Sequence, residues 1–236
     1  MPNFSIFRSQ DNRTTGRRQS RRGQPQLEDL EGRQLLSTLL VTNTADSGTG
    51  SLRQAIKSSN STTASATNLI DFQIGSGGTQ TINLQSALPT ITHPVVIDGT
   101  TQPGSGAAPR IVLNGSCAGK TAVGLTLTAS GSTIKGLAID DFGSDGVDIN
   151  SASKDLITDD YIGVTQTGRQ ASNGGNGVKI SGSSSNDTVG GTVAGAGNLI
   201  SGNGAHGIEL SGATNNFVQG NLIGTNAAGS DRKSVV

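Results

Sequence analysis

One pattern of residues occurs four times in the second half of this chain, in copies that start at Gly124, Gly146, Gly177 and Gly207. In the clearest copy, Gly207-Ile208-Glu209-Leu210 is followed, five residues later, by Asn216-Phe217-Val218-Gln219-Gly220-Asn221-Leu222-Ile223-Gly224. Every copy consists of short alternating runs of apolar and polar residues, separated by Gly, Asn, Asp or Ser. Such a repeat predicts short strands joined by tight corners and wound into coils that stack on one another.

The spacing of the copies separates the coils from their loops. The first two copies start 22 residues apart, whereas the next two intervals are 31 and 30 residues. The additional residues fall in 165–176 and 191–197, which are rich in small and polar residues, so we interpret them as loops extruded from a coil of about 22 residues. Alternate residues of a strand face opposite sides, and stacked strands lie about 4.8 Å apart. The residues expected to face inward are Val147, Ile149, Ile157, Ile162, Ile208, Leu210, Val218 and Ile223.

The composition argues against a nucleic-acid partner and against a transmembrane segment. Residues 41–230 hold eight Lys and Arg against twelve Asp and Glu, and aromatic residues make up only 3% of the chain. We therefore expect no nucleic-acid partner, because such a partner needs clustered cations or stacking platforms. No run of 18 apolar residues is present, so the sequence predicts no transmembrane segment. The single cysteine, Cys117, is expected to be a small buried residue.

Residues 1–37 are expected to form a disordered basic leader. Residues 1–26 are polar and rich in Arg, and such a segment buries too little apolar surface to offset its ordering entropy. Residues 27–37, Leu-Glu-Asp-Leu-Glu-Gly-Arg-Gln-Leu-Leu-Ser, resemble the Leu-Glu-x-Arg-x-Leu-Leu-Ser segment of many exported surface proteins of planctomycete-type bacteria, with Glu31-Gly32 inserted. The resemblance implies export and processing, and hence an extracellular or cell-surface location. A short amphipathic helix leading into the domain is the alternative interpretation.

The domain after the leader begins with a strand and a short helix. Ser51-Leu52-Arg53-Gln54-Ala55-Ile56 has the spacing of a capping box, which predicts a helix to about Ser58. The same residues resemble the Ser-Leu-Arg-Glu-Ala-Ile motif that opens many bacterial right-handed parallel β-helix proteins, with Gln54 in place of Glu. The resemblance and the repeat together predict an all-β fold: a right-handed parallel β-helix over residues 38–230 with a short N-terminal capping helix. An open coil stack exposes apolar core and unpaired backbone, which such a helix would cover.

Residues 231–236 break the repeat abruptly. Asp-Arg-Lys-Ser-Val-Val resembles a read-through of a common sequencing adapter, so we expect a non-native tail. On this interpretation the β-helix is truncated at its C-terminal end, and the natural chain continues through more coils. We expect a monomeric solenoid within a longer chain.

Seven carboxylates between residues 140 and 160 are the first candidates for chemistry. They could supply the acid and base of a glycosidase, with Asp140, Asp141, Asp159 and Asp160 as catalytic candidates. They could also bind Ca²⁺, which takes several oxygen ligands, with Asp155, Asp159 and Asp160 as candidate ligands. No cofactor other than calcium is expected. The alternative is that these acids only stabilise turns. Asp155, Asp159 and Asp160 align with Asn216, Gly220 and Asn221 at predicted corners, where Asn, Asp and Gly are interchangeable.

Two further residues are weaker catalytic candidates. His206 lies in Gly204-Ala205-His206-Gly207, which resembles the Gly-His-Gly of pectin hydrolases, although the Asn-Thr-Asp and Arg-Ile-Lys of those enzymes are missing. Arg169 falls in a predicted loop near the coil of Asp159 and Asp160, and pectate lyases need an Arg base beside acids that bind Ca²⁺. A solvated loop position is the alternative for both.

The sequence therefore leaves two functions open, since one fold hosts many activities. The first is an exported or cell-surface scaffold for adhesion, matrix or carbohydrate contact, as part of a longer protein. The second is a polysaccharide lyase or glycoside hydrolase acting on uronic-acid-rich polymers. An enzyme requires charged groups that converge from adjacent coils, whereas a scaffold fills its corners with interchangeable Asn, Asp and Gly.

Overall fold

The computed structural model describes residues 38–230 except 64, 65 and 105. The expected basic leader and the expected non-native tail lie outside these residues. The described part consists mostly of parallel β-strands, with one α-helix, α1 (Leu52–Asn60), and one 3-10 helix, η1 (Gly99–Thr101). No helix among the described residues is long and apolar enough to cross a membrane.

The strands form three sheets in which neighbouring strands are parallel and follow chain order. The seven-stranded sheet contains β1 (Thr38–Val41), β2 (Asn68–Phe72), β4 (Val95–Asp98), β7 (Thr133–Lys135), β10 (Leu156–Thr158), β13 (Thr188–Gly190) and β16 (Phe217–Gln219). The six-stranded sheet contains β3 (Gln80–Asn83), β5 (Ile111–Asn114), β8 (Leu137–Asp140), β11 (Tyr161–Ile162), β14 (Leu199–Ile200) and β17 (Leu222–Ile223). The four-stranded sheet contains β6 (Leu125–Leu127), β9 (Val147–Asn150), β12 (Val178–Ser181) and β15 (Ile208–Ser211).

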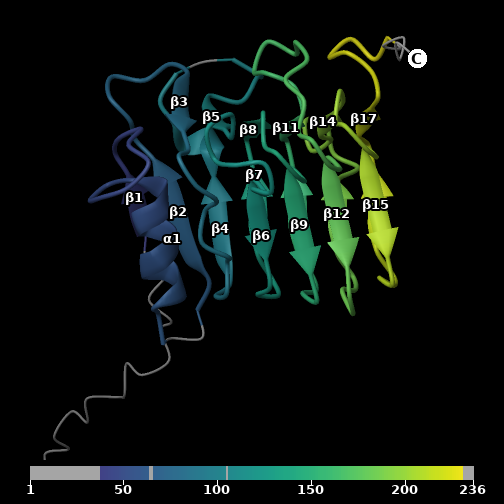
Figure 1. Cartoon of the computed structure of the whole chain (residues 1–236), viewed down its shortest axis with the longest axis horizontal. Coiled ribbons are helices and arrows are strands. Elements are labelled where there is room, and N and C mark those ends of the chain that lie inside the picture. The colour runs from purple at the N-terminus through teal and green to yellow at the C-terminus, as the bar shows by residue number, and fades with distance from the viewer. Residues whose placement is uncertain (1–37, 64–65, 105, 231–236) are drawn as a thin grey trace, which may run out of the picture. The chain divides into compact units, whose positions relative to one another are not determined.

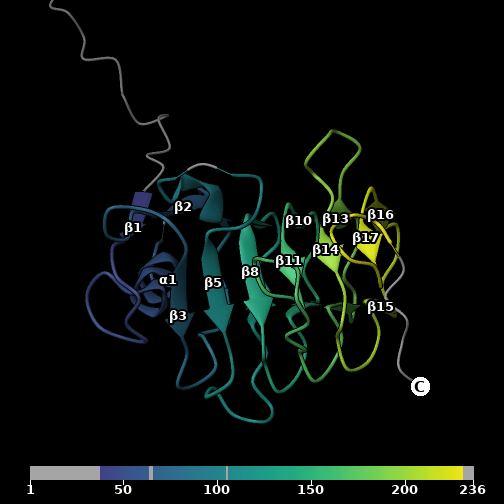
Figure 2. The same ribbon diagram turned by 90° about the horizontal axis from the view of Figure 1, so that it is seen from above.

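From β6 onward the chain visits the three sheets in rotation. We call each such set of three strands a rung: β6–β7–β8, β9–β10–β11, β12–β13–β14 and β15–β16–β17. Figures 1 and 2 show the strands of one sheet side by side, in the colour order of the chain. Val147 pairs with Val178, and Val178 pairs with Ile208, which is the register that the repeat predicts. Residues 165–176 and 191–197 contain no strand, so the prediction of loops there is confirmed.

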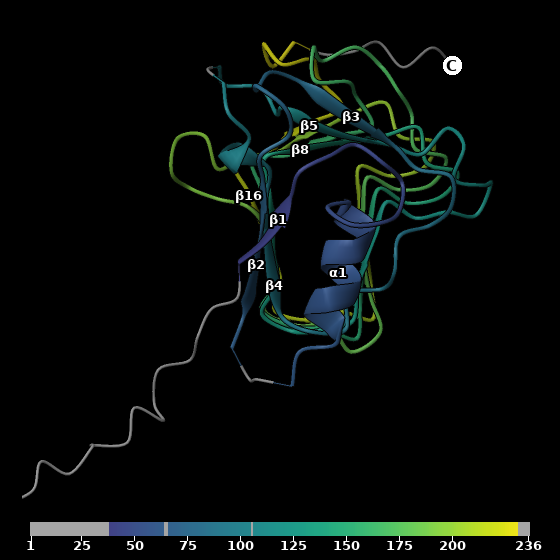
Figure 3. The same ribbon diagram turned by 90° about the vertical axis from the view of Figure 1, so that its left-hand side faces the viewer.

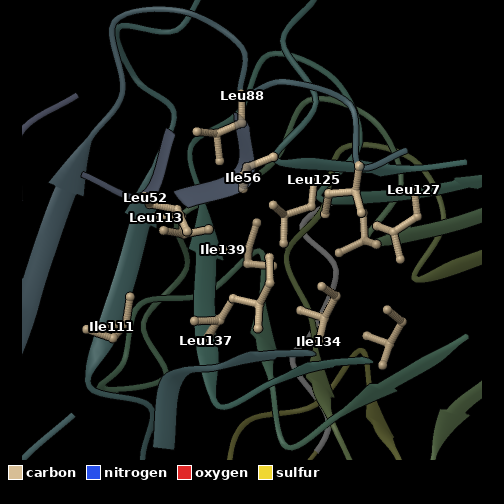
Figure 4. Packing of buried hydrophobic residues seen from close by; sticks show 14 of the residues in the cluster. Leu52, Ile56, Leu88, Ile111, Leu113, Leu125, Leu127, Ile134, Leu137 and Ile139 are labelled. Carbon is tan, nitrogen blue, oxygen red and sulfur yellow. The ribbon is translucent and has the colours of Figure 1, made fainter. Parts of the chain in front are cut away.

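The core lies between the three sheets and consists of apolar residues that stack from rung to rung. Four of the residues expected to face inward, Val147, Ile149, Ile157 and Ile162, are fully buried. Figure 4 shows this packing, with Leu125 of β6 and both Leu137 and Ile139 of β8 in the core. In the last rung the expectation of burial is wrong, because no further rung covers it in the described chain: Leu210, Val218 and Ile223 are exposed.

Helix α1 covers the end of the sheets where β1 and β2 lie (Figure 3). The Ser51 side chain accepts the backbone N–H of Gln54 at 3.2 Å, so the predicted N-cap is confirmed, although the helix extends to Asn60. Leu52 and Ile56 enter the hydrophobic core. Arg53 is buried and donates to the Asp46 carboxylate at 2.7 Å and to the carbonyl oxygens of Ser86 and Ala87.

Two details of the sequence analysis are corrected by the structure. Cys117 is exposed, so the expectation of a buried cysteine is wrong. Among the acids assigned to corners, Asp159 adopts a left-handed φ of 57°, as a turn residue does. Asp155 and Asp160 have no positive φ and are almost completely buried, so the expectation that they are exposed turn residues is wrong.

Candidate functional site

Asp155 belongs to a ladder of side chains that runs across successive rungs. Its Oδ1 atom accepts the backbone N–H of Ser132 at 2.6 Å, and its own N–H donates to Oδ1 of Asp187 at 2.9 Å. The N–H of Asp187 in turn donates to Oδ1 of Asn216 at 2.8 Å. Each ladder residue therefore satisfies a backbone donor of the preceding rung that the strands leave unpaired.

Asp160 belongs to a second ladder of the same kind. Its Oδ1 atom accepts the N–H of Leu137 at 2.8 Å, and its N–H donates to Oδ1 of Asn198 at 2.9 Å. Asn221 continues this ladder by accepting the N–H of Asn198 at 3.0 Å. Asp160 is fully buried, so it has a structural position and cannot contact a substrate.

The ladder carboxylates have perturbed acidities. Burial raises the pKa of Asp155 to about 7, with the hydrogen bond from Ser132 opposing the shift. Burial also raises the pKa of Asp160 well above its usual value and raises that of Asp187. The Oδ2 atoms of all three are buried without a hydrogen-bond partner. A protonated carboxyl group is favoured there because ionisation would leave a poorly compensated charge.

The pair Asp140 and Asp141 lies at a different place from Asp159 and Asp160. The Asn114 amide donates to both Asp140 Oδ1 and Asp141 Oδ2 at 2.9 Å. Burial raises the pKa of Asp140 to about 6, against the effect of this hydrogen bond, and the charge of Asp141 contributes in the same direction as burial. Asp141 lines an open hollow of about 280 Å³ with Lys120 and Cys117. The structure thus does not bring the two acidic pairs into one site.

Neither His206 nor Arg169 forms a hydrogen bond with a residue of the two acidic pairs among the described residues. Nδ1 of His206 lies 3.0 Å from the Asn176 Oδ1 atom, and Asn176 is held by Asp145. The Arg169 backbone forms a tight turn with Thr165, and its exposed side chain makes no hydrogen bond or ion pair with a described residue. Neither residue completes a catalytic arrangement with Asp159 or Asp160.

A row of charged residues crosses the outer face of the seven-stranded sheet. Asp71 on β2 is in register with Asp98 on β4, and Asp98 is in register with Lys135 on β7. Lys135 Nζ lies 2.8 Å from Asp98 Oδ2, and both side chains are partly exposed. Asp159 extends the row, because it follows Thr158 on β10, which is in register with Lys135. Burial raises the pKa of Asp159, the charge of Lys135 lowers it and the charge of Asp98 raises it. We call Asp71, Asp98, Lys135 and Asp159 the charged row.

Two hollows adjoin the charged row and share Asp159 and Ala107 in their walls. The first, of about 80 Å³, is lined by Arg110, Thr100 and Gln102 among others. Arg110 is partly exposed, and its guanidinium has no hydrogen-bond or ion-pair partner among the described residues. The second hollow, of about 250 Å³, is lined by Tyr161, Asn198 and Leu199. Together they provide a carboxylate, a guanidinium and an aromatic ring, which are groups that bind sugar hydroxyls and ring faces.

The candidate calcium ligands are not arranged as one site. Asp155 and Asp160 bind backbone donors in separate ladders, and Asp159 joins the charged row. In the part of the chain that the structure describes, no group of three or more His, Cys, Asp or Glu residues could hold a metal ion.

No family model and no curated protein matches this chain. The site is therefore interpreted from its geometry. Sequence reasoning found Asp159 but missed Asp98, Lys135 and Arg110, which are isolated charges in the sequence. Asp71, Asp98 and Lys135 each follow a buried apolar residue near the end of a strand in the seven-stranded sheet, so a complete assignment of the early coils would have aligned them.

Proposed function

We propose that this chain is an exported or cell-surface scaffold for adhesion, matrix or carbohydrate contact, and that it forms part of a longer protein. The observation that carries the proposal is the charged row beside the two hollows, which spans β2, β4, β7 and the corner after β10. Contacts distributed over successive rungs fit an extended polymer better than a compact ligand. Most of the remaining acids of residues 140–160 are used in hydrogen bonds within the fold.

The scaffold itself is, on this proposal, a right-handed parallel β-helix. The rotation of the chain through three parallel sheets supports the helical winding. The handedness is supported by the general rule that crossovers between parallel strands are right-handed. Export is supported by the resemblance of residues 27–37 to the N-terminal segment of exported surface proteins.

The test is the binding of the full chain to immobilised polyuronides and neutral glycans. We expect binding to weaken in Lys135→Ala and Tyr161→Ala, because Lys135 belongs to the charged row and Tyr161 lines the second hollow, which shares Asp159 with that row. Lys179→Ala is the matched control, since Lys179 is a partly exposed strand lysine of the four-stranded sheet. Equal binding by the Lys135→Ala variant and the unchanged chain would contradict the proposal.

A polysaccharide lyase or hydrolase acting on uronic-acid-rich polymers is the second candidate. It is favoured by the convergence of Asp98, Lys135 and Asp159 from successive turns of the chain, together with Arg110, which has no side-chain partner among the described residues. Such groups could abstract a proton and balance a substrate carboxylate. The same glycan panel, followed by the absorbance of unsaturated ends and the release of reducing ends, separates the two functions. Turnover that Lys135→Ala abolishes would identify an enzyme.

A further inference from the structure

The last rung, β15–β16–β17, exposes an apolar surface that the other rungs bury. Seven large hydrophobic residues are exposed in the described chain, and five of them belong to this rung. These five are Leu210, Phe217, Val218, Leu222 and Ile223, at 50%, 57%, 43%, 39% and 44% exposure. Each of the three strands is the last of its sheet, so its outer backbone edge also lacks a neighbouring strand.

The equivalent residues one rung earlier show what this surface lacks. Val189 is in register with Val218, and Ile200 is in register with Ile223. Val189 and Ile200 are fully buried, because a rung lies on each side of them. The last rung has such a neighbour on one side only.

The ladder hydrogen bonds all run in one direction, and this direction determines which backbone group the last rung leaves without a partner. In each described step a ladder oxygen accepts the N–H of the rung before it, as Asp187 does for Asp155 and Asn216 does for Asp187. At the last rung the Asn216 N–H therefore has no acceptor among the described residues. At this ladder position the surface therefore presents a backbone donor that requires an acceptor.

The opposite end of the sheets is covered, because α1 inserts Leu52 and Ile56 into the core there. A second copy of this chain could thus approach the open surface only with its own last rung. That arrangement would place the Asn216 donors of one copy against those of the other. A parallel rung with Asn or Asp at the ladder positions would instead bring an acceptor to each donor.

We propose that the surface formed by β15, β16 and β17 is the docking surface for one further parallel rung of the same repeat, continuous with this polypeptide. The occupant carries Asn or Asp at the positions equivalent to Asn216 and Asn221, and apolar residues at those of Val218 and Ile223. This inference rests on the part of the proposed function in which the chain belongs to a longer protein. It does not depend on glycan contact.

The test inserts a second copy of residues 202–224 between Gly224 and Thr225 of the full chain. Both the parent and the extended chain carry Cys117→Ser, which removes the exposed thiol, and Val218→Cys as a reporter. We expect the reporter to react with a thiol reagent roughly tenfold more slowly, or slower still, in the extended chain, because it becomes interior. Amide hydrogen exchange of β15–β17 in the chain without reporter substitutions provides a second readout.

The matched control is the same insertion with both ladder asparagines of the copy changed to Ala. Less protection in this control supports the ladder chemistry, whereas equal protection would overturn it. Unchanged reporter and amide rates in the extended chain would overturn the docking of a rung. A concentration-dependent dimer of the parent chain that protects the reporter would also overturn the proposal, in favour of a second copy. None of these readouts involves a glycan, so they fail independently of the binding test.

Discussion

The Asp187 carboxylate accepts the backbone N–H of Asp155 at 2.9 Å, one rung away, and both residues leave a buried Oδ2 atom without a partner. Two asparagines of the ladder that contains Asp160, Asn198 and Asn221, use both side-chain polar atoms in hydrogen bonds. Asn198 accepts the N–H of Asp160 and also donates Nδ2 to the Ile157 carbonyl oxygen at 2.8 Å. An acid in these ladders therefore provides the acceptor but lacks the donor, unless it is protonated.

The first prediction is that Asp160→Asn stabilises the protein at about pH 8. The new amide should donate to the Ile134 carbonyl oxygen, since Ile134 is in register with Ile157. Relieving a buried, unsatisfied polar atom is worth about 1–3 kcal/mol. The measurement is the urea midpoint, with Asp159→Asn as the control because Asp159 is partly exposed and outside the ladders. A lower midpoint for Asp160→Asn would contradict the ladder interpretation.

The second prediction is that the free energy of unfolding falls as the pH rises from about 4 to above about 7. Burial raises the pKa of Asp155 to about 7 and that of Asp140 to about 6, above the ordinary value of 3.8. Within this window the folded state binds more protons than the unfolded state, so raising the pH favours unfolding. Below about 4 both states are protonated and the effect ends.

The measurement is a series of urea midpoints across this pH range. Asp155→Asn should flatten the slope, since it removes one of the titrating groups while keeping the ladder acceptor. A midpoint that rises steadily up to about pH 8 would show that the buried carboxylates do not control stability.

The rung architecture was predictable because its signal is periodic. Val147, Val178 and Ile208 stand at the same place in each copy of the repeat, and they pair in that register. The burial of Asp155 and Asp160 was not predictable in the same way. A corner residue and a ladder residue can both be Asn or Asp, and only the backbone conformation and the neighbouring rung distinguish them. The charged row was missed because Asp98 and Lys135 are far apart in the sequence and become neighbours only through sheet register.

The third prediction compares a charge inside the stack with one at its open surface. Val189→Asp should destabilise the protein by roughly 3–5 kcal/mol, because it buries an uncompensated charge between two rungs. Val218→Asp, at the residue in register with it, should cost much less, since Val218 is 43% exposed. Urea midpoints and the far-ultraviolet strand signal would measure both variants. Equal losses would mean that the last rung is as enclosed as the one before it.

The fourth prediction concerns the attachment of the capping helix. Arg53 donates through Nε to the Asp46 carbonyl oxygen at 3.0 Å and through its guanidinium to the Asp46 carboxylate, Ser86 and Ala87. A lysine in this place has a single ammonium group and cannot reproduce the planar fork, so Arg53→Lys loses several of these part-buried hydrogen bonds. We expect a loss of about 1–3 kcal/mol, seen as a lower urea midpoint.

Hydrogen exchange should show that this loss begins at α1, because Arg53 connects the first turn of the helix to the carbonyl oxygens of Ser86 and Ala87. Arg169→Lys is the matched control, as Arg169 is exposed and its guanidinium has no partner among the described residues. Equal midpoints for the two variants would mean that apolar packing of Leu52 and Ile56 suffices to hold the helix.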